Sequence, residues 1–473
     1  MIKQDFERPI AVKLLINIGA LLDIPTGFYV KGKEGQNVLL GGLGGITAVV
    51  GRGNRFKSTV IHYMMLSAAD RIMSTAETSM STYDTEINIH EHTLKRFISR
   101  FTELSKSDII YEGIWNITDK TVYHGNKWFE QVKAYIKNKV DNKKECTVST
   151  PFIERDGVSN MEVIVPTFSE IDSFSEFETE DVAKMQDENE LGDSGANTLY
   201  MRQGLSKARF LSEAPSLFGG GNHFLLMTAH LDDAVQVSKG PYAPQPVKKL
   251  QHMKMDDKVK GVTGKFFFLM NNCWHASTST GLVNQGTKGP EYPKNANDNI
   301  AGDTDLNLVT LVQLRSKSGP SGYSVDLVVS QSEGVLPSLT EFHFIKTNKY
   351  GLSGTLQSYS LDIYPDVKLS RTTVRSKIDT DEKLRRALNI TAELLQISQY
   401  HRSYSDILCT PKELYDDIIK LGYDWNMILS ETRGWWTVND DKHPLKFLST
   451  LDLLEMRAGR YTPYWLNKKD KKK

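Results

Sequence analysis

The sequence predicts an α/β fold in which a mostly parallel sheet is flanked by helices. Short apolar runs rich in β-branched residues alternate with helical patterns over residues 38–361, as in successive strand–helix–strand units. After residue 370 the apolar positions recur only at helical spacing, over residues 382–401 and 411–421. We therefore expect a short N-terminal arm (1–36), an α/β core (37–370) and a small helical C-terminal domain (371–473) with a basic tail.

The N-terminal arm contains an apolar stretch, residues 10–22, that predicts a helix. Such a helix would dock either on an adjacent subunit or on its own core.

The composition is that of an ordinary globular chain, with 473 residues, 39% hydrophobic and 25% charged. No apolar run approaches the roughly 18 residues of a membrane span, and the first residues lack the pattern of a signal peptide. Cys146, Cys273 and Cys409 are widely spaced and form no C-x-x-C pair. We therefore expect a reducing compartment, with neither a disulfide nor a structural zinc site.

Residues 46–65, ITAVVGRGNRFKSTVIHYMM, combine a buried strand, a glycine-bearing turn and an apolar helix that begins near Lys57. This order suits a nucleoside triphosphate, because loop N–H groups and the lysine hold phosphates while the next hydroxyl, Ser58, binds Mg²⁺. Phe56 replaces the glycine that normally precedes the lysine. The expected nucleotide-binding residues are Gly51, Arg52, Gly53, Asn54, Arg55, Phe56, Lys57, Ser58 and Thr59. The alternative is a plain strand–turn–helix with a surface lysine.

Two later strand-like runs end in acidic residues. The first ends at residues 84–86, where Glu86 is a candidate to orient and deprotonate an attacking water. The second ends at Asp172, in the position of a carboxylate that holds the nucleotide's Mg²⁺. Ser169 and Glu170 interrupt its apolar pattern, so an exposed strand edge is the alternative there. A solvated acidic cluster is the alternative for Glu86.

A further run, residues 223–233, reads HFLLMTAHLDD and predicts a strand containing His230. A polar side chain here can sense the γ-phosphate and act on the loop that follows. A satisfied structural histidine is the alternative.

These segments together resemble the RecA family of recombinases, and within it the UvsX type of T-even phages. The resemblance is carried by Phe56-Lys57-Ser58, Tyr83-Asp84-Thr85-Glu86, Ile171-Asp172-Ser173 and His230, and it extends over about residues 21–370. It implies a RecA-like P-loop ATPase core that uses ATP and Mg²⁺, with Ser58 and Asp172 as metal ligands. It also implies a location in the cytoplasm of an infected bacterial host.

The segment FHFIKTNKYGLSGTLQSYSLDIYP, residues 342–365, resembles the RecA segment whose lysines reach a neighbouring subunit's ATP. Lys346 and Lys349 are the matching candidates, and a strand at residues 361–364 would follow them. A cation supplied in this way would stabilise charge on the γ-phosphoryl group. Solvated lysines at a strand edge are the alternative.

The net charge is zero, but residues 237–300 contain nine lysines and four acids, with aromatic residues between them. Lysines can follow phosphates while aromatic rings stack on bases. We expect a DNA-binding loop insertion here, following the His230 strand as in the family. Its FFFLM cluster, residues 266–270, is expected in the core or an interface. The candidate DNA contacts are Lys248, Lys249, Lys254, Lys258 and Lys260.

Residues 173–193 are strongly acidic, with eight acids and one lysine. They are either a solvated insertion, with the first DNA loop displaced to residues 199–209, or a docking segment for a basic partner surface. The first option makes Arg202, Lys207 and Arg209 further candidate DNA contacts.

The function expected from these features is that of a DNA-dependent ATPase. It would form helical filaments on single-stranded DNA, bind ATP between subunits and promote homologous pairing and strand exchange with duplex DNA. Mediator or single-strand-binding proteins are possible partners, and no membrane is expected. One alternative is a hexameric DnaB-like helicase, which is disfavoured because only 50 residues precede Gly51. The other is a nonhydrolysing DNA-binding scaffold.

Overall fold

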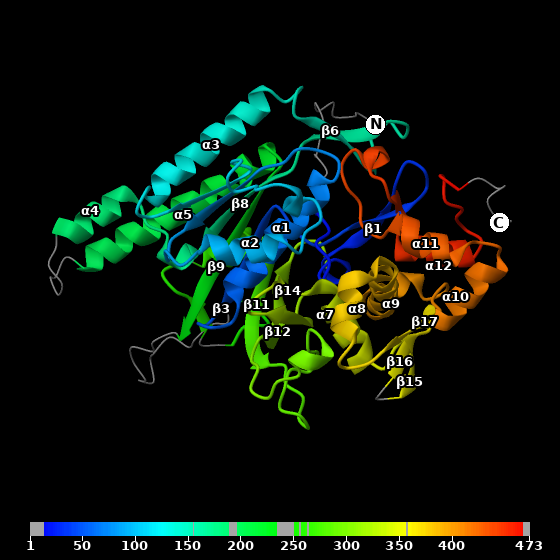
Figure 1. Ribbon diagram of the computed structural model, residues 1–473. Helices are drawn as coiled ribbons and strands as arrows, with labels where there is room; N and C mark the ends of the chain where they lie inside the picture. Colours follow the sequence, from blue (N-terminus) through cyan, green and yellow to red (C-terminus); the bar gives the residue numbers. More distant parts are fainter. Residues whose placement is uncertain are drawn as a thin grey trace, which may run out of the picture.

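The structure, a computed structural model, describes residues 14–154, 156–188, 196–233, 250–254, 257–262, 264–355 and 358–466. Within these residues a ten-stranded sheet forms the centre of the molecule (Figure 1). Its strands, in spatial order, are β14 (Gly334–Val335), β13 (Ser324–Ser330), β12 (Leu306–Ser316), β11 (Asn272–Gly281), β3 (Ile46–Gly51), β9 (His223–Asp233), β8 (Thr167–Asp172), β4 (Met80–Asp84) and β5 (Trp115–Asp119), with β10 (Asp257–Val259) beside β9.

The part of the sheet from β11 to β5 is parallel, and β12, β13 and β14 continue it as antiparallel strands. This arrangement confirms the predicted α/β class with a mostly parallel sheet flanked by helices. Parallel strands end at the same edge of a sheet. The ends of β3, β4, β8 and β9 therefore lie close to one another.

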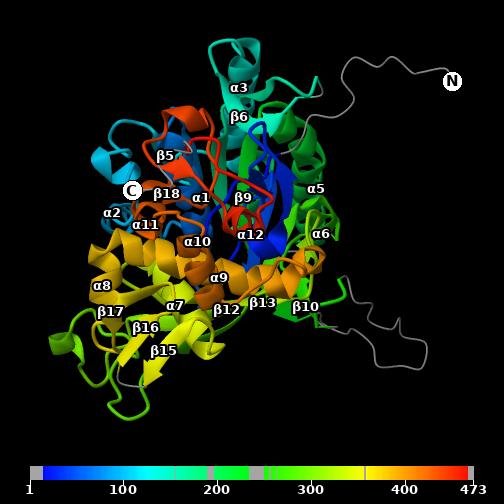
Figure 2. The same ribbon diagram turned by 90° about the vertical axis from the view of Figure 1, so that its right-hand side faces the viewer.

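Helices cover both faces of the sheet, as Figure 2 shows with α1 on one side and α5 and α6 on the other. Successive side chains of β9 alternate between the two layers: Phe224 and Leu226 belong to the hydrophobic core on the α1 side, whereas Leu225 and Met227 belong to the core beneath α5. Burial on both faces explains why this strand is almost continuously apolar.

The remaining elements extend from this core. The helices are α1 (Lys57–Met73), α2 (Glu91–Ile98), α3 (Gly125–Asp141), α4 (Glu180–Glu188), α5 (Ala196–Gly220), α6 (Lys265–Leu269), α7 (Pro337–Thr347), α8 (Val374–Thr380), α9 (Glu382–Tyr400), α10 (Pro411–Lys420), α11 (Trp425–Glu431) and α12 (Thr450–Arg457). The smaller sheets are β1 (Phe28–Lys31) with β2 (Asn37–Leu40), β6 (Thr147–Ile153) with β7 (Asn160–Ile164), β15 (Leu352–Thr355) with β16 (Ser358–Leu361) and β17 (Tyr364–Leu369), and β18 (Thr432–Arg433) with β19 (Lys446–Phe447).

Three expectations about local structure are wrong. The described part of the predicted N-terminal helix, residues 14–22, is not helical: Ile16 pairs with Leu43 in an isolated bridge, and residues 19–21 form a turn with positive φ. The predicted loop insertion at 237–300 contains β11, which pairs with β3 in the centre of the sheet. The predicted strand at 361–364 is the turn between β16 and β17. In each case apolar residues are buried by a tertiary contact that short-range periodicity does not specify.

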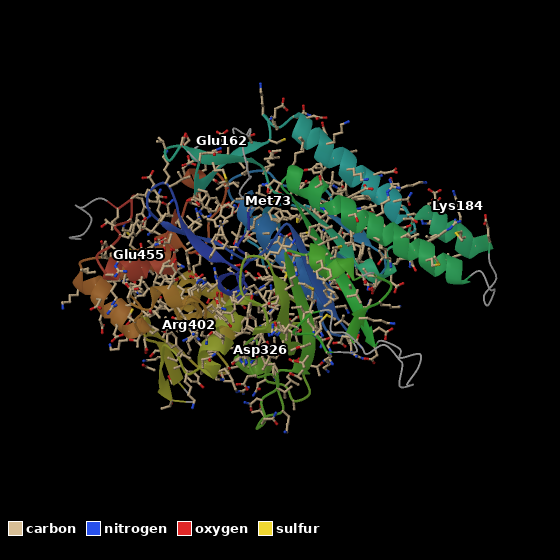
Figure 3. All side chains as sticks on the ribbon, turned by 180° about the vertical axis from the view of Figure 1, so that it is seen from behind. Met73, Glu162, Lys184, Asp326, Arg402 and Glu455 are labelled. Atoms are coloured by element: carbon tan, nitrogen blue, oxygen red, sulfur yellow. The ribbon has the colours of Figure 1, made fainter. Side chains whose placement is uncertain are left out.

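The acidic segment after β8 forms α4, whose Val182 is buried among its charged neighbours. Figure 3, seen from behind, places Lys184 of α4 and Glu455 of α12 at opposite sides of the molecule. The acidic helix is thus remote from the C-terminal helices.

The C-terminal helices pack directly on the core, because α9 lies against α7 and one hydrophobic cluster contains residues from both regions. Trp425 and Trp436 are buried in it. A polar group lies inside this contact: the amide of Asn389 donates to Glu341 at 3.3 Å and to Glu393 at 3.0 Å. Burial raises the pKa of Glu341 to about 8.

We predict that Glu341→Gln removes a pH dependence of stability. Glu341 holds a proton in the folded state up to about pH 8, whereas in the unfolded chain it ionises near its ordinary value of 4.5. Stability therefore falls as the pH rises from 4.5 to 8. Near pH 8 the variant should exceed the wild type by about 1–3 kcal/mol in urea unfolding. The exposed control Glu382→Gln should leave the dependence of unfolding free energy on pH unchanged. If this dependence were the same in Glu341→Gln as in the wild type, the account would be contradicted.

Candidate functional site

The loop after β3, residues 52–56, is the candidate phosphate loop. Gly51 ends the strand, residues 52–55 form the turn and Lys57 is the first residue of α1. Lys57 is 7% exposed, and its ammonium group donates to the Arg52 carbonyl oxygen at 2.9 Å, so this group lies over the loop. Helix starts leave N–H groups unbonded, here around Ser58 and Thr59. These groups and the amine form a site suited to phosphate oxygens.

Phe56, the departure from the usual glycine, has a left-handed backbone with φ of 55° and ψ of 27°. This explains why glycine is common at the position, since a Cβ atom is costly at positive φ. Phe56 is partly buried and packs against the large core cluster, which offsets part of the strain.

Gly51 is required for a different reason, the close approach of β11. A Cβ atom at Gly51 would lie 2.9 Å from the Ala276 carbonyl oxygen and 3.5 Å from Cδ of Lys57. A larger residue here would press on the backbone of β11, whereas the distance to Lys57 is an ordinary contact.

Glu86 is held in place by a carboxylate two residues earlier. Both oxygens of Asp84 accept backbone N–H groups, from Glu86 and Ile87 at 3.0 and 2.8 Å and from Asn88 and Ile89 at 2.8 and 2.9 Å. Asp84 is 3% exposed. Its four accepted bonds organise the turn that carries Glu86, a role that sequence analysis does not assign although Asp84 lies within the Tyr83–Glu86 motif.

Asp172 ends β8 at the same sheet edge, with one oxygen paired and the other open. Its Oδ1 accepts a hydrogen bond from Thr228 of β9, while its buried Oδ2 is without a hydrogen-bond partner in the described chain. An unpartnered buried carboxylate oxygen is costly unless a cation satisfies it. Together with the Ser58 hydroxyl, this oxygen suits Mg²⁺, which prefers oxygen ligands.

The residues before Asp172 are not an exposed strand edge, since Ser169 and Glu170 are both 0% exposed. Glu170 lies beneath Asp172 and pairs with His62 of α1, whose Nδ1 is 2.8 and 2.9 Å from its two oxygens. Burial lowers the pKa of His62, but the adjoining Glu170 carboxylate outweighs this and raises it above its usual value. Burial likewise raises the pKa of Glu170.

Ligand atoms of His62, Glu170 and Asp172 lie within 4.8 Å of one another. This cluster could hold a metal ion, but the existing hydrogen bonds already pair His62 with Glu170. We interpret these two residues as a buried support for Asp172. Sequence analysis missed His62 because its partner is 108 residues away.

His230 lies between the phosphate loop and Glu86. In the pairing of β3 with β9 it is the direct partner of Gly51, and its Nε2 is 2.7 Å from Oε1 of Glu86. This hydrogen bond is the main cause of the lowered pKa of Glu86, to which the charge of Lys57 also contributes. Burial lowers the pKa of Lys57, while the charges of Asp172 and Glu86 oppose that shift. The structure thus brings Lys57, Glu86, Asp172 and His230 into one electrostatically coupled group.

The candidate DNA contacts differ in exposure. Arg202, Arg209, Lys254 and Lys260 are exposed, Lys258 is half-buried on β10, and Lys248 and Lys249 lie outside the described residues. Lys207 is 0% exposed, so the expectation that it contacts DNA at the surface is wrong. Helical spacing turns it toward the core side of α5. The FFFLM cluster is largely buried, as expected, with Phe268 alone 59% exposed among its described phenylalanines.

Lys346 and Lys349 lie at the end of α7 rather than on a strand edge. The Lys346 ammonium group is 2.9 Å from Glu291 and 5.0 Å from the centre of the Tyr292 ring. Lys349 follows in an exposed turn with φ of 52°. In this chain, then, Lys346 is paired with an acid and does not join the four-residue group.

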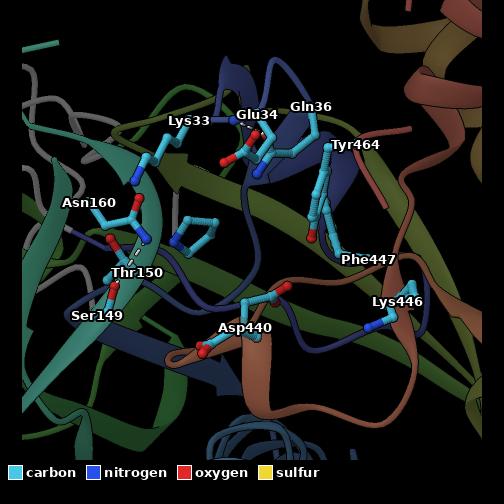
Figure 4. A pocket seen from close by; sticks show the side chains of 12 residues that line it. Lys33, Glu34, Gln36, Ser149, Thr150, Asn160, Asp440, Lys446, Phe447 and Tyr464 are labelled. Carbon is cyan, nitrogen blue, oxygen red and sulfur yellow. Dashed lines mark hydrogen bonds between the residues drawn. The ribbon is translucent and has the colours of Figure 1, made fainter. Parts of the chain in front are cut away.

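A separate cavity of about 240 Å³ lies between the β1–β2 turn, the β6–β7 hairpin and the C-terminal region (Figure 4). Lys33, Asn160, Asp440 and Tyr464 are among the residues that line it. None of the predicted site residues lines this cavity.

Comparison of the sequence with models of protein families and with curated proteins finds no match. In the described part of the chain, no helix has both the length and the apolar character needed to cross a membrane.

We predict that Phe56→Gly is more stable than Phe56→Ala by about 0.5–1 kcal/mol. Both variants lose the ring, but only glycine adopts the positive φ without a Cβ penalty. Chemical denaturation of the two proteins measures the difference. Equal stabilities, or a more stable alanine variant, would show that the left-handed conformation is not maintained in solution.

Proposed function

We propose that this protein is a DNA-dependent ATPase of the RecA type that assembles on single-stranded DNA and promotes homologous pairing and strand exchange. The observation that carries the proposal is the convergence of Lys57, Glu86, Asp172 and His230 at one edge of the parallel sheet. These residues are separated by up to 173 positions, yet their charges influence one another. Each has the chemistry that its place in the RecA pattern requires.

In this proposal ATP is hydrolysed by a water molecule that Glu86 orients and deprotonates. The lowered pKa of Glu86 keeps its carboxylate ionised at neutral pH, and the His230 hydrogen bond fixes one of its oxygens. Lys57 and the N–H groups at the start of α1 hold the phosphates. Ser58 and the open oxygen of Asp172 would hold Mg²⁺, which when bound neutralises charge on the transferred phosphoryl group.

The DNA part of the proposal is supported by the connection between the phosphate loop and the basic segment after β9. Arg52 forms a two-pronged ion pair with Asp233 at the end of β9, and its Nη2 is 3.4 Å from Asp257 at the start of β10. The loop is therefore tied to both ends of the segment 234–256. Lys254, Lys258 and Lys260 lie at or near β10, where they would meet phosphates.

Assembly into a filament would place ATP between subunits, with Lys346 or Lys349 facing the neighbour's phosphates. Because Lys346 is paired with Glu291 in the isolated chain, this role requires the ion pair to open or be shared on assembly. The proposed location is the bacterial cytoplasm.

The first test is ATP turnover. The wild type should hydrolyse ATP, with single-stranded DNA stimulating the rate. Lys57→Ala should weaken ATP binding and abolish turnover, whereas Glu86→Gln should bind ATP but lower kcat by about 10²–10⁴-fold. Lys446→Ala, at the remote cavity, is the matched control and should be unaffected. Turnover retained in Glu86→Gln would show that another residue is the base.

The second test separates the recombinase from its alternatives. Electron microscopy with single-stranded DNA and a nonhydrolysable ATP analogue should show helical filaments. Rings, together with unwinding of forked duplexes, would support a hexameric helicase. DNA binding by a wild-type protein that never hydrolyses ATP would support the scaffold.

A further inference from the structure

Lys207 is a fully buried lysine with no role in the proposed site. It lies on α5, and its ammonium group donates to the Ser175 carbonyl oxygen at 2.6 Å. Within the described chain, no carboxylate oxygen lies within 4.0 Å of it. Burial lowers its pKa to about 8. A buried cation held by one carbonyl is costly for folding, so its position needs an explanation.

The acceptor of Lys207 belongs to a short 3₁₀ turn that also holds His230. This turn, Phe174–Glu176, directly follows Asp172 and Ser173. The Ser175 hydroxyl accepts a hydrogen bond from the backbone N–H of His230 at 2.9 Å, and Ser175 is itself 3% exposed. Because His230 is bonded to Glu86 at 2.7 Å, three contacts connect Lys207 to the candidate catalytic base.

The carbonyl group of His230 also bonds to a chain segment next to Lys207. The His230 carbonyl oxygen accepts from the N–H of Lys260, and a Cβ atom at the adjacent Gly261 would lie 3.2 Å from the Lys207 amine. The ammonium group is therefore enclosed by the turn after β8 and by the chain that leaves β10. A shift of α5 that moved the Lys207 ammonium group would therefore disturb the chain segments that bond to the N–H and to the carbonyl oxygen of His230.

The outer side of α5 carries a different set of residues. Met201, Arg202, Leu205 and Arg209 are exposed there. A ligand bound to this surface would contact the same helix that places Lys207 in the interior. The geometry thus gives α5 one accessible side and one side joined to the site.

We propose that Lys207 is a positioning residue that couples α5 to His230 and Glu86 through Ser175. The proposal rests on the proposed function, in which His230 and Glu86 act on ATP. This positioning role replaces the surface contact with DNA that the sequence predicted for Lys207. Lys207 holds the turn after β8, the turn holds the His230 backbone, and His230 holds the carboxylate that activates water.

The test compares Lys207→Met with Lys139→Met. Methionine fills similar volume but cannot donate the hydrogen bond. Lys139 is a matched control because it is also buried, at 5% exposed, and donates to the Val165 carbonyl oxygen at 2.8 Å and to Thr167, away from the candidate site. With saturating single-stranded DNA, Lys207→Met should lower kcat for ATP about tenfold or more. Its KM for ATP and its affinity for DNA should stay within about threefold of the wild type.

A second variant, Ser175→Ala, removes the hydroxyl that accepts from His230. If Lys207 acts through Ser175, the loss of kcat in the double variant should be little larger than the greater of the two single-variant losses. Additive losses, an unchanged kcat in Lys207→Met, or an equal loss in Lys139→Met would overturn the proposal. A large fall in DNA affinity with kcat preserved would instead return Lys207 to a binding role.

Hydrogen–deuterium exchange supplies a readout that needs no activity. The amide of His230 should exchange at least about tenfold faster in Lys207→Met than in the wild type, and at the wild-type rate in Lys139→Met. Absence of ATP hydrolysis in the wild type would overturn the proposed function alone. Unchanged exchange at His230 would overturn the coupling itself.

Discussion

The parallel pairing of β3, β9, β8 and β4 is the constraint on which the candidate site depends. Gly51 pairs with His230 between β3 and β9, and Asp84 pairs with Asp172 between β4 and β8. These register positions place the strand ends at one edge of the sheet. Polar residues far apart in the sequence therefore meet, while the apolar residues before them fill the two cores on either face.

Grouping polar side chains at the edge of a buried sheet requires hydrogen bonds beneath them. Asp84 accepts four backbone N–H groups, Thr228 donates to Asp172, and His62 pairs with Glu170 one layer deeper. Without these partners the buried carboxylates would be strongly unfavourable. Oδ2 of Asp172 accepts no hydrogen bond within the described chain, so this oxygen is available to a cation.

Two different interactions join this sheet edge to the segments beside it. Arg52 connects the phosphate loop to Asp233 and Asp257 by partly exposed ion pairs, which salt and competing phosphates weaken. Lys207 of α5 reaches His230 through buried hydrogen bonds, which solvent does not screen. In the proposed function, phosphate can displace the exposed contact, and the buried contact transmits the position of α5 to His230.

The sequence by itself determined the α/β class, the strand that enters the phosphate loop and the strand ends that carry Glu86, Asp172 and His230. These features depend on local patterns, such as apolar runs that end in polar residues, which persist whatever the chain packs against. Local pattern did not distinguish the buried strand β11 from a loop, or the irregular residues 14–22 from a helix.

Only the tertiary structure decided that Lys207 faces the interior and that His62 supports Glu170. Their partners lie 32 and 108 residues away in the sequence. Such partners are chosen by strand order and register, and these are set by the packing of the whole domain rather than by any short segment.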